Sequence, residues 1–401
     1  MAATQLISVS DVIAGDLNKN ENETKYCPQC NDSVDENMNN TNDNLTEVQK
    51  FYNGKNILIT GATGFLGKIL VEKLLRCCPG VENLYLLVRQ KRGKDIYTRM
   101  EEIFDDPVFS RLKEEVPKFR HKVVVVPADC EAAGLGLTLT DRQMLTEKVN
   151  IIFHSAATVK FDEHLRAALV TNVMAPLHLL RLARDVKKLD VLMHISTAYS
   201  NSHLPMIEER FYPCEANCEQ LHQMVDKLTD DQLNIMLPKI LGPWPNTYTF
   251  TKALAEKELR ASAGGMPIGI FRPAIVISTA KEPLKGWLDN MYGPTGVAVG
   301  SGKMLKVYRK IHKFSSVLSY FCTREIKFCN SRTRELWEKT SEADKKTLLS
   351  APDNKVYFLH PGCLRFMVDI IIIVVNTFVI LYCTVRVKKR DFINIITYVC
   401  N

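Results

Sequence analysis

The sequence predicts an α/β fold in which helices cover both faces of a parallel, doubly wound sheet. Short runs rich in β-branched residues alternate with helical segments over most of residues 54–303. This is the pattern of repeated strand–helix–strand units. The first run leads straight into a glycine-rich turn and a helix, and small or polar residues follow the later runs. Parallel sheets of this kind bind ligands at those carboxyl ends of their strands.

Composition and charge narrow the classes of function. The chain has 401 residues, 46% hydrophobic and 24% charged, which allows one large domain with appended segments, or two domains. The net charge is +7; residues 1–50 hold three Lys/Arg and nine Asp/Glu, or −6, so the remainder carries +13. A basic body suits an anionic cofactor, an anionic substrate or a membrane face. We expect no nucleic-acid binding, because the basic residues form no aromatic-interleaved patch and no recognition helix.

The N-terminal stretch differs from the rest of the chain. Residues 1–53 are rich in Asn, Asp and Glu, and we predict a disordered polar tail because they cannot bury enough apolar surface to offset chain entropy. The 12 cysteines occur without an apolar leader after Met1, which favours free thiols in a reducing compartment. Cys27 and Cys30 form a CPQC pair with no second pair, so we predict no metal site.

The first predicted unit runs from Asn56 to Arg76 and reads NILITGATGFLGKILVEKLLR. Gly61 permits the tight turn, Gly64 lets a phosphate approach the backbone, and Gly67 lets the helix pack on the strand. The helix start offers unpaired N–H groups and the positive end of its dipole to a pyrophosphate. An ordinary strand–helix turn that happens to use glycine is the alternative. We predict a dinucleotide-binding turn, with these cofactor-binding residues: Thr60, Gly61, Thr63, Gly64, Phe65, Leu66 and Gly67.

The second predicted strand, Leu84 to Val88, ends in Arg89. A carboxylate at this position would bind the ribose 2′-hydroxyl of NAD, whereas a cation accepts the 2′-phosphate of NADP. Lys91 and Arg92 follow, with no acid nearby in the sequence. We therefore predict NADPH as the cofactor; a solvated basic loop is the alternative.

The third and fourth predicted strands are Lys122 to Val126 and Asn150 to His154. Asp129 follows the third strand, where it could accept a hydrogen bond from the adenine amino group or cap a helix. Ala156 follows the fourth strand, and its small side chain would let the backbone approach the cofactor. Asn172 lies at the next helix, where it could order a proton-relay water.

The fifth predicted strand, Asp190 to Ile195, is followed by Ser196 and Thr197. Later, Tyr248 and Lys252 are four residues apart, which places both on one face of a helix. A phenol with a pKa near ~10 is a poor acid–base group at neutral pH, and an adjacent ammonium would lower that pKa. We predict that Tyr248 and Lys252 are catalytic and that the hydroxyl of Thr197 or Ser196 binds the substrate oxygen. A buried tyrosine beside a surface lysine is the alternative.

The sixth predicted strand, Pro267 to Phe271, leads to Pro273, which we also assign to cofactor binding. The alternation of strands and helices predicts a doubly wound sheet of the Rossmann type, with the reactive groups at the carboxyl ends of its strands.

Several motifs resemble those of known proteins. Four are similar to motifs of the extended short-chain dehydrogenases: TGATGFLG (Thr60 to Gly67), HSAATVKFDE (His154 to Glu163), STAYS (Ser196 to Ser200) and YTFTK (Tyr248 to Lys252). Two more narrow the resemblance to the fatty acyl-CoA reductases, the male-sterility-like branch, with an insect-like character: FRPAIVIS (Phe271 to Ser278) and EPLKGWLDNMYGPTG (Glu282 to Gly296). The resemblance runs from about Gly54 to Gly302 and resumes at Lys306.

The resemblance implies the chemistry. It implies an enzyme that reduces long-chain fatty acyl-CoA with NADPH to a fatty alcohol, through an aldehyde, and releases CoA. Tyr248 would be the general acid, and Lys252 its partner and a ligand of the nicotinamide ribose. Thr197 would be the catalytic hydroxyl, with Ser196 as the second choice. The alternatives are another extended short-chain dehydrogenase, acting on a sterol or a nucleotide sugar, and a catalytically impaired isoform that retains only cofactor binding.

One departure from the family concerns the substrate region. After Gly296 the chain reads VAVGSGKML and then enters KVYRKIHKF directly. Members of the family carry a long stretch here, with a late sheet strand and much of the acyl-binding wall. We therefore expect residues 54–303 to form an NADP-binding reductase domain with an incomplete substrate part. Such a protein should bind NADPH but reduce acyl-CoA poorly.

The C-terminal part divides into three predicted segments. Residues 304–360 resemble the family's helical C-terminal domain. Residues 366–385 form an apolar run long enough to cross a bilayer, and 386–401 form a basic tail. A re-entrant hairpin, an interfacial helix and a buried core helix are the alternatives for the apolar run. The resemblance implies association with the ER or peroxisomal membrane, with the catalytic domain facing the cytosol.

Overall fold

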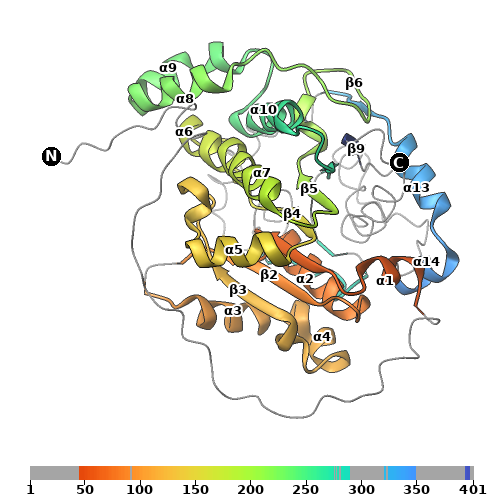
Figure 1. Cartoon of the computed structure of the whole chain (residues 1–401). Helices are drawn as coiled ribbons and strands as arrows, with labels where there is room; N and C mark the ends of the chain where they lie inside the picture. Colours follow the sequence, from red (N-terminus) through yellow and green to blue (C-terminus); the bar gives the residue numbers. More distant parts are fainter. Residues whose placement is uncertain are drawn as a thin grey trace, which may run out of the picture.

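A seven-stranded sheet with helices on both faces forms the centre of the computed structural model (Figure 1). The structure describes residues 45–90, 93–274, 276, 278–279, 281–289, 320–321, 324–348 and 393–397.

All strands of this sheet run parallel to their neighbours, in the order β3-β2-β1-β4-β5-β7-β9. This order confirms the predicted doubly wound sheet, and the six predicted strands agree with the observed ones to within one residue at each end. The strands are β1 (Asn56–Thr60), β2 (Asn83–Val88), β3 (Val123–Pro127), β4 (Ile151–His154), β5 (Val191–Ile195), β7 (Ile268–Arg272) and β9 (Ile393–Thr397).

Strand β9 corrects the prediction that 386–401 are only a basic tail. It pairs in parallel with β7, from Ile268 opposite Ile393 to Arg272 opposite Thr397. The run INIIT is rich in β-branched residues, which favour strands. The error came from reading the charges before this run and not the run itself.

Each face of the sheet has its own hydrophobic core, because successive strand residues point to opposite faces. Ile57 and Ile59 of β1 pack in one cluster, and Leu58 packs in the other. The first face is covered by α1 (Glu47–Tyr52), α2 (Phe65–Cys77), α3 (Ile96–Phe104) and α4 (Ser110–Glu115). The second is covered by α5 (Leu139–Lys148), α7 (Ala175–Asp185) and α10 (Thr247–Ser262). A third cluster joins α10 to α6 (Leu165–Leu169), α8 (Cys218–Lys227) and α9 (Asp230–Leu241).

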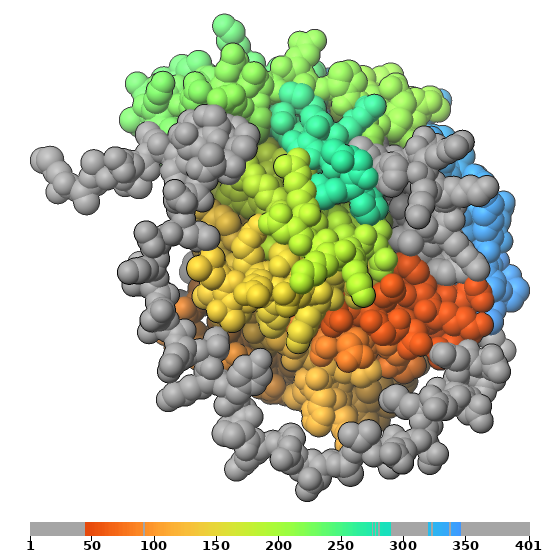
Figure 2. All heavy atoms as spheres, viewed as in Figure 1, coloured from red at the N-terminus to blue at the C-terminus, as the bar shows by residue number. Residues whose placement is uncertain are grey.

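Helix α1 shows that the predicted tail of residues 1–53 is too long. Thr46 caps the helix with a capping box, and Val48 and Tyr52 are fully buried. The Val48 N–H donates to Asp344 Oδ1 at 3.1 Å, on α14 (Glu342–Leu348). Figure 2 shows the blue residues 324–348 on the same side of the molecule as the orange-red start of the described chain. The helix has one partner at the Cys77 carbonyl oxygen, 28 residues away, and another at Asp344, almost 300 residues away, and neither could be seen in the local sequence.

The described part of the C-terminal region is attached to the sheet domain by backbone and side-chain bonds. Strand β8 (Lys327–Phe328) pairs with β6 (Met206–Ile207). The buried Glu209 carboxylate accepts from the N–H groups of Arg332 at 2.6 Å and Thr333 at 3.1 Å, at the start of α13 (Ser331–Lys339). Residues 324–348 are therefore largely helical, as predicted for 304–360, and the rest of that range lies outside the described residues.

Among the described residues, no helix combines the length and the apolar character that a bilayer crossing requires. The predicted membrane segment, 366–385, lies outside the described residues.

A buried ion pair joins α10 to β7. Arg272 is fully buried and donates to both carboxylate oxygens of Glu256, through Nε at 3.0 Å and Nη2 at 2.5 Å. Its guanidinium also donates to the carbonyl oxygens of Glu208 at 3.2 Å and Arg210 at 3.0 Å. One side chain thus holds a helix, a strand and a loop together.

Replacing Arg272 with Leu should lower the free energy of unfolding by about 3–5 kcal/mol, because the buried Glu256 charge loses its partner. Urea denaturation measures the loss. The control is Arg142→Leu, which removes an exposed pair with Asp185 and should cost under about 1 kcal/mol. Similar small losses for both variants would contradict a structural role for the buried pair.

Candidate active site

The glycine turn between β1 and α2 is closely packed against the end of β4. Gly61 has φ +70°, and a Cβ there would lie 2.6 Å from the Ala156 nitrogen. A Cβ on Gly67 would lie 2.1 Å from the Gly61 carbonyl oxygen. Neither position has room for a side chain, so these glycines bring the start of α2 and the ends of β1 and β4 together.

The start of α2 has the features of an anion site. Gly64 is the N-cap, is exposed, and supplies no side-chain cap to the first turn. A Cβ on Gly64 would meet only the Gly61 carbonyl oxygen, at 3.4 Å, so the space above it is open. Phe65 and Leu66 begin the helix, where backbone N–H groups and the helix dipole favour a phosphate. These residues fit the pyrophosphate of a dinucleotide.

The Thr60 side chain is buried and therefore not placed to contact a ligand. Its Oγ1 accepts from the Ala156 N–H at 3.2 Å and lies 2.7 Å from His154 Nδ1. Thr60 therefore joins β1 to β4 below the turn, and the surface of the turn is formed by the residues after it.

Two arginines lie at the end of β2. Arg99 of α3 donates to the Arg89 carbonyl oxygen at 2.5 Å and to Thr63 Oγ1 at 3.3 Å. Burial and the nearby Arg89 charge lower the pKa of Arg99. Arg89 itself pairs with Glu131 at 3.0 Å, an acid that is 42 positions away in the sequence and that the loop after β3 brings to this arginine. Lys91 and Arg92 lie outside the described residues.

Arg99 is a candidate that sequence reasoning missed. It lies in the first turns of the helix after β2, ten residues beyond Arg89. A basic residue there, on a helix that starts beside the glycine turn, was the available signal.

Two other predicted cofactor residues make hydrogen bonds within the protein. The Asp129 carboxylate accepts from the Glu131 N–H at 3.0 Å and closes its own turn, and the helical turn that follows has Ala132 as its N-cap instead. The Pro273 carbonyl oxygen accepts from the Ala198 N–H at 2.8 Å, which fixes the segment that carries Thr197. Both residues lie at strand carboxyl ends, as predicted.

The predicted general acid Tyr248 and the predicted substrate hydroxyl Thr197 lie close to each other. Asn246 caps α10 by accepting from the Thr249 N–H at 2.9 Å, and Tyr248 lies in the first turn of that helix. The Thr197 hydroxyl accepts from the Tyr199 N–H at 3.2 Å. Burial raises the pKa of Tyr248 to about 12, although the neighbouring Thr197 hydroxyl lowers it in part. Tyr248 therefore keeps its proton at neutral pH.

Lys252 does not lower the pKa of Tyr248 as predicted. Its ammonium is buried and donates to the Ile195 carbonyl oxygen at 2.8 Å. Burial lowers the pKa of Lys252 to about 8, against the attraction of Glu256. The sequence correctly placed Lys252 one turn from Tyr248, but the long side chain reaches across to the end of β5, and the group that lowers the phenol's pKa is Thr197.

Ser196 and Asn172 are occupied by other bonds. Ser196 Oγ donates to Glu256 at 2.5 Å and belongs to the network of Arg272, so the geometry favours Thr197 as the substrate hydroxyl. Asn172 lies in a π-helical turn between α6 and α7, and its amide donates both protons, to the Thr158 carbonyl oxygen and to Thr251 Oγ1, at 3.1 Å each. Its oxygen accepts from the Thr158 N–H at 3.0 Å. The prediction that the Asn172 side chain orders a water is therefore not supported.

An aromatic layer surrounds Tyr248 and was not predicted. The ring of Phe161 stacks on that of Tyr248 with centroids 5.5 Å apart. Phe321, from the C-terminal region, lies 5.5 Å from Phe161 and 5.3 Å from Tyr199. An apolar side chain from a segment far along the chain, Phe321, thus forms part of the site. No local pattern in the sequence predicted this contact.

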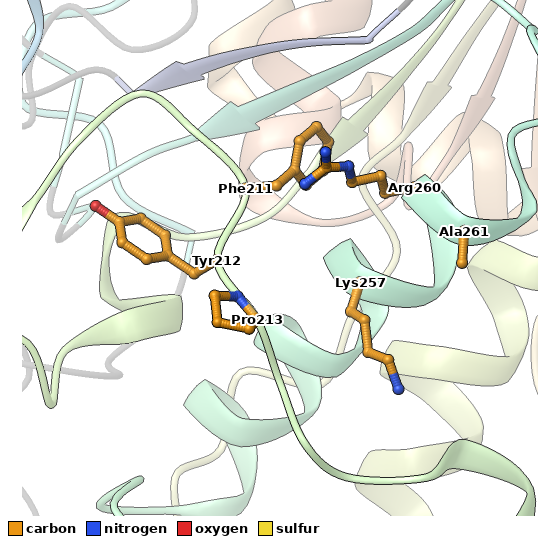
Figure 3. A pocket seen from close by; sticks show the side chains of 6 residues that line it. All are labelled: Phe211, Tyr212, Pro213, Lys257, Arg260 and Ala261. Carbon is orange, nitrogen blue, oxygen red and sulfur yellow. The ribbon is translucent and has the colours of Figure 1, made fainter.

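A separate pocket of about 420 Å³ lies between a loop and the second half of α10 (Figure 3). None of the predicted site residues lines it. Its lining is Phe211, Tyr212, Pro213, Lys257, Arg260 and Ala261.

Two buried histidines lie beneath the site. His154 and His194 are register partners on β4 and β5, and their rings stack 5.3 Å apart. Burial lowers the pKa of His154 to about 3 and that of His194 far below its usual range, and the Lys252 charge adds to both effects. Within the described part of the chain, neither ring nitrogen of His194 has a hydrogen-bond partner.

This pair should make the fold sensitive to acid. Below pH ~6.5 each histidine binds a proton in the unfolded state but not in the folded state. The free energy of unfolding therefore decreases by about 1.4 kcal/mol per histidine for each unit by which the pH is lowered. We expect His194→Phe to remove one such contribution between pH 6 and 4 and to cost little at pH 7.5, because it also removes two unsatisfied nitrogens.

Urea unfolding at a series of pH values measures this slope. The exposed His121→Phe variant should leave it unchanged. An equal slope in the wild type and His194→Phe would show that the buried ring titrates normally.

Comparisons with known proteins agree with the geometry. The chain matches two family models, both described as male sterility protein, the first an NAD-binding model over residues 59–320 and the second over 295–355. Among curated relatives, fatty acyl-CoA reductase wat of Drosophila melanogaster is 45% identical over 262 residues, or 65% of this chain and 50% of that protein. Fatty acyl-CoA reductase 1 of Homo sapiens is 42% identical over 259 residues, with the same coverage of 65% and 50%.

The chain therefore spans about half the length of the curated relatives it matches. Among solved structures, the terminal R domain of the myxalamid PKS-NRPS biosynthetic pathway is similar at 26% identity. That match covers 59% of this chain and 53% of the other, with a TM-score of 0.43.

Proposed function

This chain belongs to the male sterility protein family, and we propose that it reduces long-chain fatty acyl-CoA with NADPH, through an aldehyde, to a fatty alcohol. The family model is an NAD-binding one, so the cofactor is a nicotinamide dinucleotide. The observation that carries the proposal is the contact of Thr197 with Tyr248, beside the buried Lys252, at the strand ends next to the glycine turn. Two curated relatives, 45% and 42% identical to this chain over 262 and 259 residues, are named fatty acyl-CoA reductases.

The residues of this chain would position and protonate the substrate. When bound, NADPH supplies the hydride. Thr197 and Tyr248 would hold the carbonyl oxygen of the thioester and stabilise the negative charge that develops on it. Collapse of the tetrahedral intermediate expels the CoA thiolate, a good leaving group because its thiol has a pKa near ~8.5. In the aldehyde step, Tyr248 would donate its proton to the alkoxide oxygen, because it is protonated at neutral pH.

Lys252 would act on the cofactor side of the site. Its ammonium already donates to the Ile195 carbonyl oxygen, which leaves further N–H groups for a ribose hydroxyl or for the proton supply of Tyr248. With a pKa of about 8, it is mostly charged at neutral pH.

We propose low activity for this form, because the long stretch that family members carry after Gly296 is absent. The overlap of the two matched ranges over residues 295–320 supports this, since the two family regions adjoin here without a spacer. A form that only binds cofactor is the second candidate, favoured by the same shortening. We further propose that residues 366–385 hold the protein to a membrane with the catalytic domain in the cytosol, where both substrates occur; the length of the apolar run supports this.

NADPH oxidation by the purified protein, with and without a long-chain acyl-CoA or a long-chain aldehyde, tests the proposal. We expect slow oxidation that depends on the added substrate. Tyr248→Phe should lower it by about 100-fold or more, because the proton donor is lost, while NADPH affinity stays the same. The control Lys257→Met changes a residue of the separate pocket and should have no effect. Oxidation that survives Tyr248→Phe would exclude the mechanism, and substrate-independent oxidation or none would favour a form that only binds cofactor.

We assign the preference for NADPH over NADH to the arginine pair at the end of β2. Arg99→Ala should weaken NADPH binding by about tenfold or more and NADH binding by less than about threefold, because a guanidinium–phosphate pair is lost only with NADPH. Titration of each cofactor by its own fluorescence gives both dissociation constants. Arg120→Ala, which removes a surface pair with Glu101, serves as the control. An equal loss for both cofactors would contradict the assignment.

A further inference from the structure

The segment after β7 folds into a closed loop that rests on α2. We call Thr279 together with 281–289 the docking loop. Thr279 closes it: its N–H donates to the Trp287 carbonyl oxygen at 3.1 Å, and its Oγ1 accepts from the Trp287 N–H at 2.9 Å. The Gly286 N–H donates to the Thr279 carbonyl oxygen at 2.7 Å. These bonds fix the backbone of Trp287 within the loop.

Trp287 contacts the first turn of α2. Its ring stacks on that of Phe65 with centroids 5.1 Å apart and planes 16° from parallel. Its Nε1 donates to Asp106 Oδ1 at 2.7 Å, and the Lys68 ammonium lies 5.5 Å from the ring centroid. Trp287 is only 8% exposed. Phe65 is the first residue of α2, directly after the N-cap Gly64.

Charged groups attach the docking loop to the same helix. Near its start, the Lys68 ammonium lies 2.8 Å from Asp106 and 3.5 Å from Asp289 of the loop. One and two turns further along α2, Lys73 and Arg76 contact Glu282 of the loop at 2.5 and 3.1 Å.

The contact lies at the part of α2 that must be ordered for anion binding. Gly64 supplies no side-chain cap, so the first turn is not held by the bonds that usually fix a helix start. Backbone N–H groups bind a pyrophosphate well only when they converge on it, and a small misplacement weakens the contact. A flat, hydrogen-bonded indole on the ring of Phe65 fixes this turn from the protein side.

We propose that Trp287 is a positioning residue of the cofactor site: by stacking on Phe65, it holds the first turn of α2 in the orientation that binds the pyrophosphate of the nicotinamide cofactor. The inference rests on the nicotinamide cofactor of the proposed function, but not on acyl-CoA reduction. It also gives the docking loop a direct contact with the cofactor site.

Binding measurements with the full chain test the proposal by comparing two ligands. NADPH contains both the 2′-phosphate and the pyrophosphate, whereas 2′,5′-ADP carries the 2′-phosphate that the arginine pair at the end of β2 would bind but only a single 5′-phosphate in place of the pyrophosphate. Trp287→Leu removes the stack and the indole N–H; we expect the NADPH dissociation constant to rise by about tenfold and that of 2′,5′-ADP by less than about twofold. Trp287→Phe keeps an aromatic ring on Phe65 and should change NADPH binding by only about two- to threefold.

A matched control separates positioning from loss of packing. Trp244 is also partly buried, and its Nε1 donates to the Ser200 carbonyl oxygen at 2.7 Å, but it packs in the core around α8, α9 and α10. Trp244→Leu should lower the melting temperature as Trp287→Leu does, yet leave both dissociation constants within about twofold.

Three results would overturn the proposal. They are unchanged NADPH affinity in Trp287→Leu, an equal loss for NADPH and 2′,5′-ADP, and an NADPH loss in Trp244→Leu as large as that in Trp287→Leu. A wild-type chain that binds NADPH with this pattern but shows no turnover of acyl-CoA would leave the positioning role intact and contradict only the proposed activity.

Discussion

The contact of backbone with backbone at the glycine turn is the constraint on which the site depends. Gly61 lies against the chain just after β4, and Gly67 lies against Gly61 itself, at distances that exclude any side chain. Because these glycines let α2 begin directly against the end of β1, its uncapped first turn lies at the strand carboxyl ends. The same edge carries Thr197 after β5 and Tyr248 at the start of α10. The proposed cofactor site and the proposed proton donor therefore share one edge of the sheet.

Several polar side chains at this edge form hydrogen bonds within the protein, and only a few are left that could take part in catalysis. Ser196 and Asn172 use their polar atoms in buried bonds to protein partners, and Thr60 joins two strands. Thr197 and Tyr248 differ, because the Thr197 hydroxyl is close enough to lower the pKa of Tyr248 and the Tyr248 side chain is partly exposed. A buried hydroxyl already bonded to a carboxylate has no spare proton for a substrate, whereas a hydroxyl pair can turn to a third oxygen. For this reason the geometry favours Thr197 over Ser196 as the hydroxyl that binds the substrate oxygen.

The sequence was sufficient for the features that depend on local pattern. The six predicted strands follow from β-branched runs, and the glycine turn and the spacing of Tyr248 and Lys252 follow from short motifs. The features that depend on residues far apart in the sequence could not be predicted from it. The pairing of Arg89 with Glu131, the reach of Lys252 to the end of β5, and Phe321 beside Phe161 each join segments far apart in the chain. Helix α1 was missed for the same reason.

Strand β9 affects how readily the purified protein should self-associate. It covers one side of β7 with a ladder of parallel backbone bonds. Without it, β7 would present a row of free N–H and C=O groups at the rim of a wholly parallel sheet, a template on which other chains can pair. We therefore expect aggregation to increase, before catalysis is lost, when an affinity tag, proteolysis or a deletion disturbs the last ten residues. Self-association is the first property to measure in such variants.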